Sequence, residues 1–285
     1  MLSLSYAALA VLPALSLVAA QDCIAFEGRV AADAVAADFD KSTSAYDPAY
    51  DLGEGLAWAD VLKFPKVDQS IYDVEGDTKA FEVTISDDSI FMDQTGFRRA
   101  ELLPNPSDLE ALTKGVKTVH FSVQADAQRG LNYSHEYMLA FQESDDYSKN
   151  QWTLTSGTFM DASNLADDEE SLQIRAATNA GEPQKVLYEV PFSAGDWHNF
   201  ALTLDFDSDT IEIFYSANQE ELKSTGAAVS NDLSGGGKYH FGMLKKPTGE
   251  GLSDVTKEGF QESGIDEGVV FGGVFFEDGA LDSCK

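Results

Sequence analysis

The segment from Phe200 to Tyr215 reads FALTLDFDSDTIEIFY. Apolar residues stand at every second position from 200 to 206 and again from 211 to 215, and Asp207-Ser208-Asp209 separates the two runs. Alternation with a period of two predicts β-strands that bury one face, and the acidic and serine cluster predicts a turn between them. This stretch therefore favours an all-β fold.

Further strands are predicted by the same pattern at residues 81–86 and 119–124. Residues 269–276 are apolar throughout, which is typical of a strand buried on both faces. Helical periodicity is scarce: the best candidate is a short helix from Ser107 to Lys114, with Ser107 as its cap and Glu110 three residues later. Many strands without alternating helices predict a two-sheet, concanavalin-like β-jelly roll with few short helices.

The amino-terminal segment predicts export. Residues 2–20 carry no charged side chain, and small residues precede Gln21. We expect residues 1–20 to be a signal peptide and the protein to be secreted and extracellular, since the apolar run is short and alanine-rich for a membrane anchor. Asn132-Tyr133-Ser134 is an N-glycosylation sequon, which predicts that Asn132 is exposed, whereas a proline blocks the sequence at Asn105.

The chain contains two cysteines, Cys23 and Cys284, near the two ends of the secreted part. In an oxidising compartment they predict one disulfide, which would contribute up to about 5 kcal/mol in the chain-entropy view. The alternative is two free thiols. A disulfide between the ends implies that the first and last strands are neighbours, so we expect residues 21–285 to form a single jelly-roll domain.

The composition limits the possible partners. The chain has 19 basic and 49 acidic residues, a formal net charge of −30, which repels nucleic acid, anionic membranes and polyuronates. We therefore expect a neutral partner and no nucleic-acid or membrane binding, with a monomer as the default. No spacing of histidines and cysteines indicates a metal site, and no phosphate-binding or Rossmann glycine pattern occurs, so we expect no metal and no cofactor.

Two segments carry residues suited to acid-base chemistry. In the strand predicted around Phe97–Pro104, Arg99 and Glu101 share one face. Glu101 is either a catalytic carboxylate positioned by Arg99 or its partner in a structural ion pair. In the segment from Ser134 to Glu143, alternation puts Tyr137, Leu139 and Phe141 in the core and Glu136, Met138 and Gln142 outside, with Glu143 at the strand end on the surface. Two carboxylates across a groove are what glycoside hydrolysis requires.

Several segments, taken in order, resemble glycoside hydrolase family 131, the secreted fungal β-glucanases. They are Glu27–Val30, Ala37–Asp40, Phe97–Pro104, His135–Tyr137, Trp197–Phe200 and Tyr239–Pro247. The resemblance implies a jelly roll with a broad open cleft that hydrolyses β-1,3-, β-1,4- and β-1,6-glucan. It implies Glu101 and Glu136 as catalytic carboxylates, assisted by His240.

Around these residues we expect substrate-binding side chains at Arg99, Gln142, Trp152, Tyr239 and Lys245. Tyr46, Tyr50 and Trp58 are further candidates for stacking on sugar rings. Two other functions stay open at this point. A polysaccharide lyase of the same fold would use Tyr239 and Lys245 beside a histidine, and a lectin would bind glucan without turnover.

Overall fold

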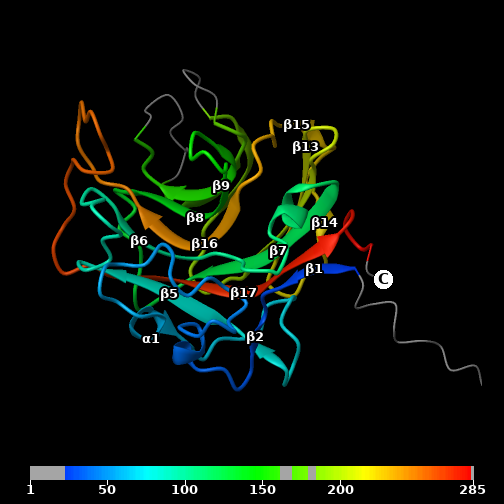
Figure 1. Cartoon of the computed structure of the whole chain (residues 1–285), viewed down its shortest axis with the longest axis horizontal. Helices are drawn as coiled ribbons and strands as arrows, with labels where there is room; N and C mark the ends of the chain where they lie inside the picture. Colours follow the sequence, from blue (N-terminus) through cyan, green and yellow to red (C-terminus); the bar gives the residue numbers. More distant parts are fainter. Residues whose placement is uncertain (1–22, 161–168, 179–183, 284–285) are drawn as a thin grey trace, which may run out of the picture.

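The computed structural model describes residues 23–160, 169–178 and 184–283. The predicted signal peptide and Cys284 lie outside these residues. Figure 1 shows two stacked layers of strands, with β8, β9 and β16 in one layer and β5, β7 and β17 in the other. The named strands pair antiparallel throughout the described part of the chain, which confirms the all-β jelly-roll prediction.

The larger sheet forms one layer of the sandwich. Its strands in spatial order are β14 (Lys223–Ser224), β13 (Thr210–Ala217), β12 (His198–Asp205), β7 (Val116–Ala125), β17 (Asp266–Asp278), β5 (Phe81–Ser86) and β3 (Leu62–Lys63), with β1 (Ile24–Glu27) on β17 and β15 (Val229–Ser230) on β13.

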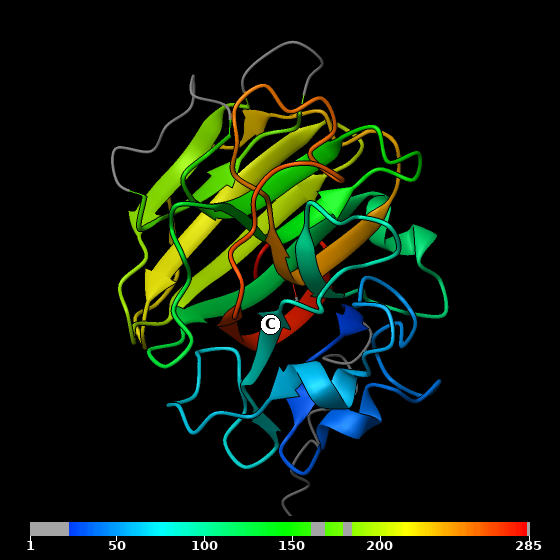
Figure 2. The same ribbon diagram turned by 90° about the vertical axis from the view of Figure 1, so that its left-hand side faces the viewer.

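The smaller sheet forms the second layer. Its order is β11 (Val186–Pro191), β10 (Ser171–Arg175), β9 (Asn150–Gly157), β8 (Glu136–Glu143), β16 (Lys238–Lys245) and β6 (Arg98–Leu102). Outside the sheets lie β2 (Val30–Ala31) paired with β4 (Thr78–Lys79), the short helix α1 (Trp58–Val61), and the 3-10 turns η1 (Ala36–Asp38) and η2 (Glu110–Thr113). The amino-terminal segment, blue to cyan in Figure 2, gathers at one side of the sandwich.

The segment 200–215 folds as predicted. β12 and β13 pair in continuous register from His198 opposite Ala217 to Asp205 opposite Thr210, and the turn between them ends at Asp209 with a φ of 51°. Apolar faces of the two sheets meet in the core, where the ring of Phe121 lies 5.5–6.1 Å from those of Trp152, Phe200 and Phe241. Burying these aromatic rings is the main favourable term that holds the layers together.

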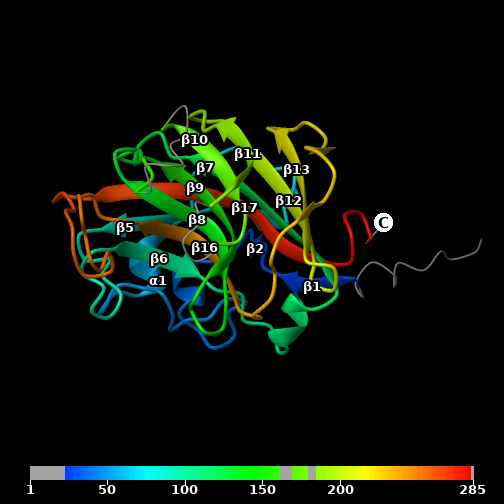
Figure 3. The same ribbon diagram turned by 90° about the horizontal axis from the view of Figure 1, so that it is seen from above.

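Strand β17 crosses most of the molecule in Figure 3, and its residues 267–277 are buried on both faces, as predicted. A bulge interrupts its pairing with β7 between Gly272 and Phe275. Gly273 has a φ of 55°, and a Cβ there would lie 2.0 Å from the Cβ of Tyr72, so glycine is needed at this bulge.

The predicted helix at 107–114 is wrong. The structure has only the 3-10 turn η2, and Ser107 does not cap it; instead the carboxylate of Asp108 accepts a hydrogen bond from the amide of Ala111 (3.2 Å). So short a segment has too few internal hydrogen bonds to offset the cost of helix nucleation.

The first and last described strands lie side by side. β1 pairs with β17, and the amide of Asp278 donates to the carbonyl of Cys23 (2.7 Å), which confirms that the first and last strands are neighbours. The disulfide to Cys284 stays a prediction. Asn132 is exposed in the turn before β8, where its side-chain oxygen accepts a hydrogen bond from the Ser134 hydroxyl (2.7 Å). Among the described residues, no helix is long and apolar enough to cross a membrane.

The free edge of β6 is covered by the chain segment 45–51. The amide of Asn105 donates to Ala45 O (2.8 Å), that of Asp47 to Leu103 O (2.9 Å), and that of Glu101 to Asp51 O (3.0 Å). Covering an edge strand satisfies backbone groups that would otherwise be unpaired. The same contact brings residues 50 and 51 to the outer face of the smaller sheet.

Candidate active site

A pocket of about 570 Å³ lies on the outer face of the smaller sheet, over β6, β16 and β8, and we call it the cleft. Its apolar floor is a cluster of Phe97, Met138, Phe141 and Leu244. Its volume is in the range of ligand-binding pockets. The charged side chains that line it include Asp51, Arg99, Glu143 and His240.

At the base of the cleft two carboxylates meet two cationic side chains. Both carboxylate oxygens of Glu101 accept from Arg99, from Nε at 2.8 Å and from a terminal nitrogen at 2.7 Å. The Nδ1 atom of His240 lies 2.7 Å from Glu101 Oε2 and 3.1 Å from Asp51 Oδ2. All four residues are less than a tenth exposed. Buried charges need such partners, because an unpaired one would be strongly destabilising.

Strands β6 and β16 set this geometry. Arg99 and Glu101 share a face because they stand two apart on β6, and Glu101 lies opposite Gly242 on β16. A Cβ at Gly242 would lie 2.2 Å from the carbonyl oxygen of Ala100, so a glycine lets the two strands approach closely here. The ring of Phe141 stacks on His240 with centroids 4.2 Å apart and an interplanar angle of 9°, which fixes the imidazole plane.

The charges at the cleft change the proton affinity of the histidine. Burial alone lowers the pKa of His240, but its hydrogen bonds to the carboxylates of Asp51 and Glu101 more than reverse this and raise it to about 9. Burial alone would raise the pKa of Asp51, yet its contact with His240 and the charge of Arg99 lower it. The structure therefore favours an imidazolium between two carboxylates.

Glu143 is the last residue of β8, and its side chain is 28% exposed in the cleft. Its Oε2 lies 3.8 Å from Nε2 of His240, and that nitrogen is buried without a hydrogen-bond partner. Burial raises the pKa of the Glu143 carboxyl, partly countered by the charges of His240 and Arg99. A carboxyl with a raised pKa at the wall of a cleft is suited to act as a general acid.

Asp51 reaches the cleft in an unusual backbone conformation. Its φ is 51°, in the left-handed region that few residues other than glycine, asparagine and aspartate adopt. The side chain is nonetheless only 7% exposed, and it lies 3.1 Å from His240 Nδ1 and 3.5 Å from a terminal nitrogen of Arg99. Backbone outliers held by surrounding contacts are concentrated at functional sites.

Comparison with known proteins decides the family. The family described as glycoside hydrolase 131 catalytic N-terminal domain matches residues 24–281. The chain belongs to glycoside hydrolase family 131. It is therefore a glycoside hydrolase, and the resemblance found in the sequence is confirmed.

Two solved structures of the family have a similar fold. The GH131 β-glucanase catalytic domain from Podospora anserina has a TM-score of 0.69 at 20% identity, over 90% of this chain and 97% of that one. The GH131 catalytic domain from Coprinopsis cinerea has a TM-score of 0.68 at 20% identity, over 91% and 96%. No curated protein matches the chain.

The structure of this family 131 member brings only some of the predicted site residues together. Glu101, Arg99 and His240 form the charged cluster, as described above. Glu136 stands at the other end of β8, about 15 Å along the strand from the residue opposite His240, and pairs with Lys246 (2.5 Å). It is therefore not the carboxylate that faces His240.

Four predicted substrate-binding residues face away from the cleft. Trp152 is fully buried in the core, and Tyr239 is buried with its hydroxyl donating to Leu112 O (2.9 Å). Gln142 is buried and donates to Gly236 O (3.2 Å), while Lys245 is buried between Glu262 (2.6 Å) and Glu267 (2.7 Å). Of the possible stacking residues Tyr46, Tyr50 and Trp58, only Tyr50 lines the cleft, because the other two are buried.

Strand irregularities explain these differences. The pairing of β8 with β9 shifts between Met138 and Ala140, and that of β16 with β8 shifts between Phe241 and Leu244. After the bulge in β8, the side chains of Phe141 and Glu143 therefore point to the cleft and that of Gln142 points to the core. This is the reverse of the expected alternation. A shift of one residue reverses every later side chain, so simple alternation could not find Glu143.

A metal could in principle use part of the cluster. Among the described residues, Asp51, Glu101 and His240 are the one group whose possible ligand atoms all lie within 4.8 Å of one another. The guanidinium of Arg99 already donates to both oxygens of Glu101 and lies beside Asp51, so these carboxylates are balanced without an added cation. We assign no metal here.

Proposed function

We propose that this glycoside hydrolase cleaves the β-1,3-, β-1,4- and β-1,6-glucosidic bonds of β-glucan in the cleft by acid-base catalysis, and that it does so outside the cell. The observation that carries the proposal is Glu143, a carboxyl with a raised pKa that lines the cleft 3.8 Å from a buried histidine nitrogen. The β-glucanase from Podospora anserina, which has a similar fold, supports the substrate class.

Glu143 acts as the proton donor to the glycosidic oxygen. Giving up its proton leaves a carboxylate beside Nε2 of His240, which the two carboxylates on Nδ1 keep protonated. The imidazolium stabilises the carboxylate as it forms, because the interaction strengthens while the bond breaks.

The second carboxylate of the reaction comes from the pair Asp51 and Glu101, which share the proton on Nδ1 of His240. Asp51 lines the cleft, while Glu101 is held from behind by Arg99. A glycosidase needs this second group either to activate water or to attack the sugar directly.

The two rival functions have less support. In a lyase, Tyr239 and Lys245 would have to reach the substrate, but both are buried with other partners on the core side of the sheet. A lectin needs no proton donor, so the raised pKa of Glu143 and its position facing His240 favour a hydrolase.

The test measures release of reducing sugar from laminarin, carboxymethyl cellulose and pustulan by the wild type, Glu143→Gln, Asp51→Asn and Glu101→Gln. We expect activity in the wild type, large losses in all three variants, and retention of most activity in the control Glu136→Gln. A wild type that is inactive on all three glucans would overturn the proposal, and an active Glu143→Gln variant would overturn the assignment of the proton donor.

A further inference from the structure

The rim of the cleft carries two large apolar side chains in left-handed backbone. Tyr147 has a φ of 58° and Met92 a φ of 52°, and both line the cleft while being 66% and 65% exposed. Tyrosine and methionine lack the short polar side chain that lets asparagine or aspartate adopt this conformation, so each position carries a conformational cost.

These residues come from loops next to β8 and β6, the two strands that flank β16 under the cleft. Tyr147 lies in the turn after β8, whose last residue, Glu143, is opposite Lys238 at the start of β16. Met92 lies in the loop before β6, whose first residue, Arg98, is opposite Lys245 at the end of β16. Between them β16 supplies His240 and Leu244 to the wall and floor.

The turn that carries Tyr147 is held rigidly. The carboxylate of Asp146 accepts from the hydroxyls of Ser144 (2.8 Å) and Ser148 (2.6 Å), and the amide of Tyr147 donates to Ser144 O (2.9 Å). These hydrogen bonds lower the pKa of Asp146 to about 2, so the carboxylate stays ionised in mildly acidic solution.

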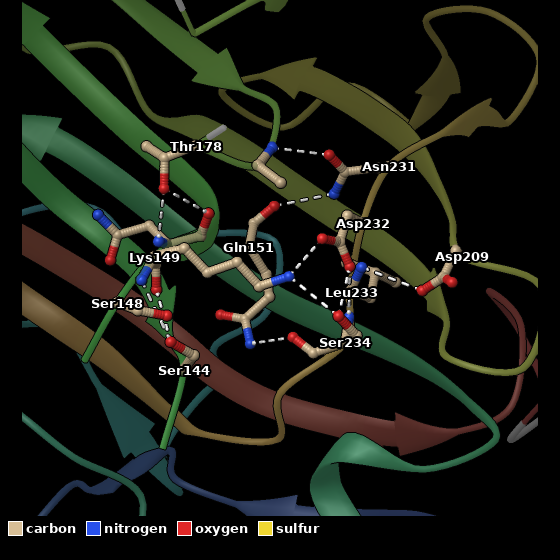
Figure 4. Close-up of polar contacts among 12 residues, drawn as sticks. Ser144, Ser148, Lys149, Gln151, Thr178, Asp209, Asn231, Asp232, Leu233 and Ser234 are labelled. Carbon is tan, nitrogen blue, oxygen red and sulfur yellow. Dashed lines mark hydrogen bonds and ion pairs between the residues drawn. The ribbon is translucent and has the colours of Figure 1, made fainter. Parts of the chain in front are cut away.

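A second set of contacts ties this turn to the loop before β16. Figure 4 shows Lys149 between Asp232 and Ser234. The Lys149 ammonium donates to the Ser234 hydroxyl (3.0 Å), and the Gln151 amide donates to the carbonyl of Ser234 (3.2 Å). The exposed ring of Tyr147 thus stands on a fixed base.

The loop that carries Met92 is fixed in a similar way. Asp93 pairs with Lys257 (2.7 Å), and the amide of Gly96 donates to Thr256 O (2.8 Å). In both cases the surrounding contacts hold a costly backbone conformation that turns an apolar side chain toward solvent. The packing of the core does not require the left-handed backbone at Met92 and Tyr147, because both side chains lie on the surface.

We propose that Tyr147 and Met92 form an apolar clamp that binds the ring faces of a neutral glucan chain on the two sides of the catalytic residues. The proposal rests on the proposed function, since it names how the same cleft holds its substrate. Sugar rings present apolar C–H faces, and a side chain on a backbone that is fixed in advance binds them with a smaller loss of conformational freedom. Ring faces are common to all β-linked glucans, so the clamp accepts several linkages.

The test measures binding of laminarihexaose and cellohexaose by calorimetry in the Glu143→Gln background, where turnover is expected to be about 10²- to 10⁴-fold slower. Tyr147→Asn and Met92→Asn remove the apolar side chain and keep a residue that tolerates left-handed backbone, and Tyr147→Phe keeps the ring. Phe260→Asn is the matched control, because Phe260 is 62% exposed and does not line the cleft.

We expect Kd to rise about three- to tenfold in Tyr147→Asn and Met92→Asn, and to stay within about twofold in Tyr147→Phe and Phe260→Asn. The Tm of the two asparagine variants should not fall, because asparagine relieves the backbone cost; a purely structural role predicts a lower Tm. Unchanged Kd values in both variants, an equal loss in Phe260→Asn, or no hexaose binding in the parent would each overturn the clamp. The proposed function is judged separately, by glucan hydrolysis in the wild type.

Discussion

Nε2 of His240 faces Oε2 of Glu143 across 3.8 Å, while Nδ1 of the same ring lies 2.7 Å from Glu101. The imidazole therefore connects a buried carboxylate to one that lines the cleft. Because the carboxylates of Glu101 and Asp51 keep the ring protonated, the buried cluster controls the charge that Glu143 experiences. This relationship gives each member of the cluster a different expected behaviour on mutation.

Replacing Glu143 by Gln should strongly reduce catalysis and leave the fold intact. The amide cannot donate a proton to the leaving group, so we expect kcat to fall about 10²- to 10⁴-fold. Burial disfavours the ionised carboxylate, so removing its charge should not lower Tm. Steady-state rates on laminarin and a melting curve check both parts. A large loss of Tm would show that Glu143 acts in folding instead.

Replacing Glu101 by Gln should cost both activity and stability. The change leaves Arg99 without its two charge-assisted hydrogen bonds in an interior site, and breaking a buried pair typically costs about 3–5 kcal/mol. Urea unfolding of Glu101→Gln and Glu143→Gln under the same conditions tests the contrast. Equal stabilities of the two variants would contradict the buried-pair interpretation.

Much of the fold could be predicted from alternation, because strands such as 200–206 and 211–215 follow the period of two without interruption. The site could be predicted only in part. Arg99 and Glu101 stand on the regular strand β6 and were found together, whereas Glu143 follows a bulge that reverses the face of its neighbours.

Asp51 is missed for a different reason. It belongs to an irregular segment that reaches the cleft only by pairing with the edge of β6, a contact between residues far apart in the sequence. No local pattern marks such a position. The left-handed φ of Asp51, Met92 and Tyr147 likewise depends on contacts made by the folded chain.

The chain ends offer a covalent test. β1 pairs with β17, and the amide of Asp278 donates to the carbonyl of Cys23, so the described residues nearest the two cysteines are neighbours. We expect thiol titration of the unfolded, unreduced secreted protein to find no free cysteine. We also expect reduction to lower the free energy of unfolding by up to about 5 kcal/mol. Two reactive thiols per chain would contradict this.

The stability of the wild type should depend on pH through His240. Its pKa is raised to about 9 in the folded protein from an ordinary value of 6.5, so folding is favoured by protonation. This contribution is fully present below about pH 6.5 and is lost as the pH rises through about 9, for a total of about 3 kcal/mol. The titratable groups that face the ring are Asp51, Glu101 and Glu143, with the charged Arg99 beside them.

The measurement is the free energy of unfolding in urea at pH 6, 7.5 and 9, for the wild type and His240→Gln. Replacing His240 should lower the free energy of unfolding at every pH, because it leaves two carboxylates next to a single arginine. It should also make the free energy of unfolding fall less steeply between pH 6.5 and 9. Parallel pH profiles in the two proteins would show that His240 is not the titrating group. A steeper decline in the wild type supports the imidazolium on which the proposed proton donor depends.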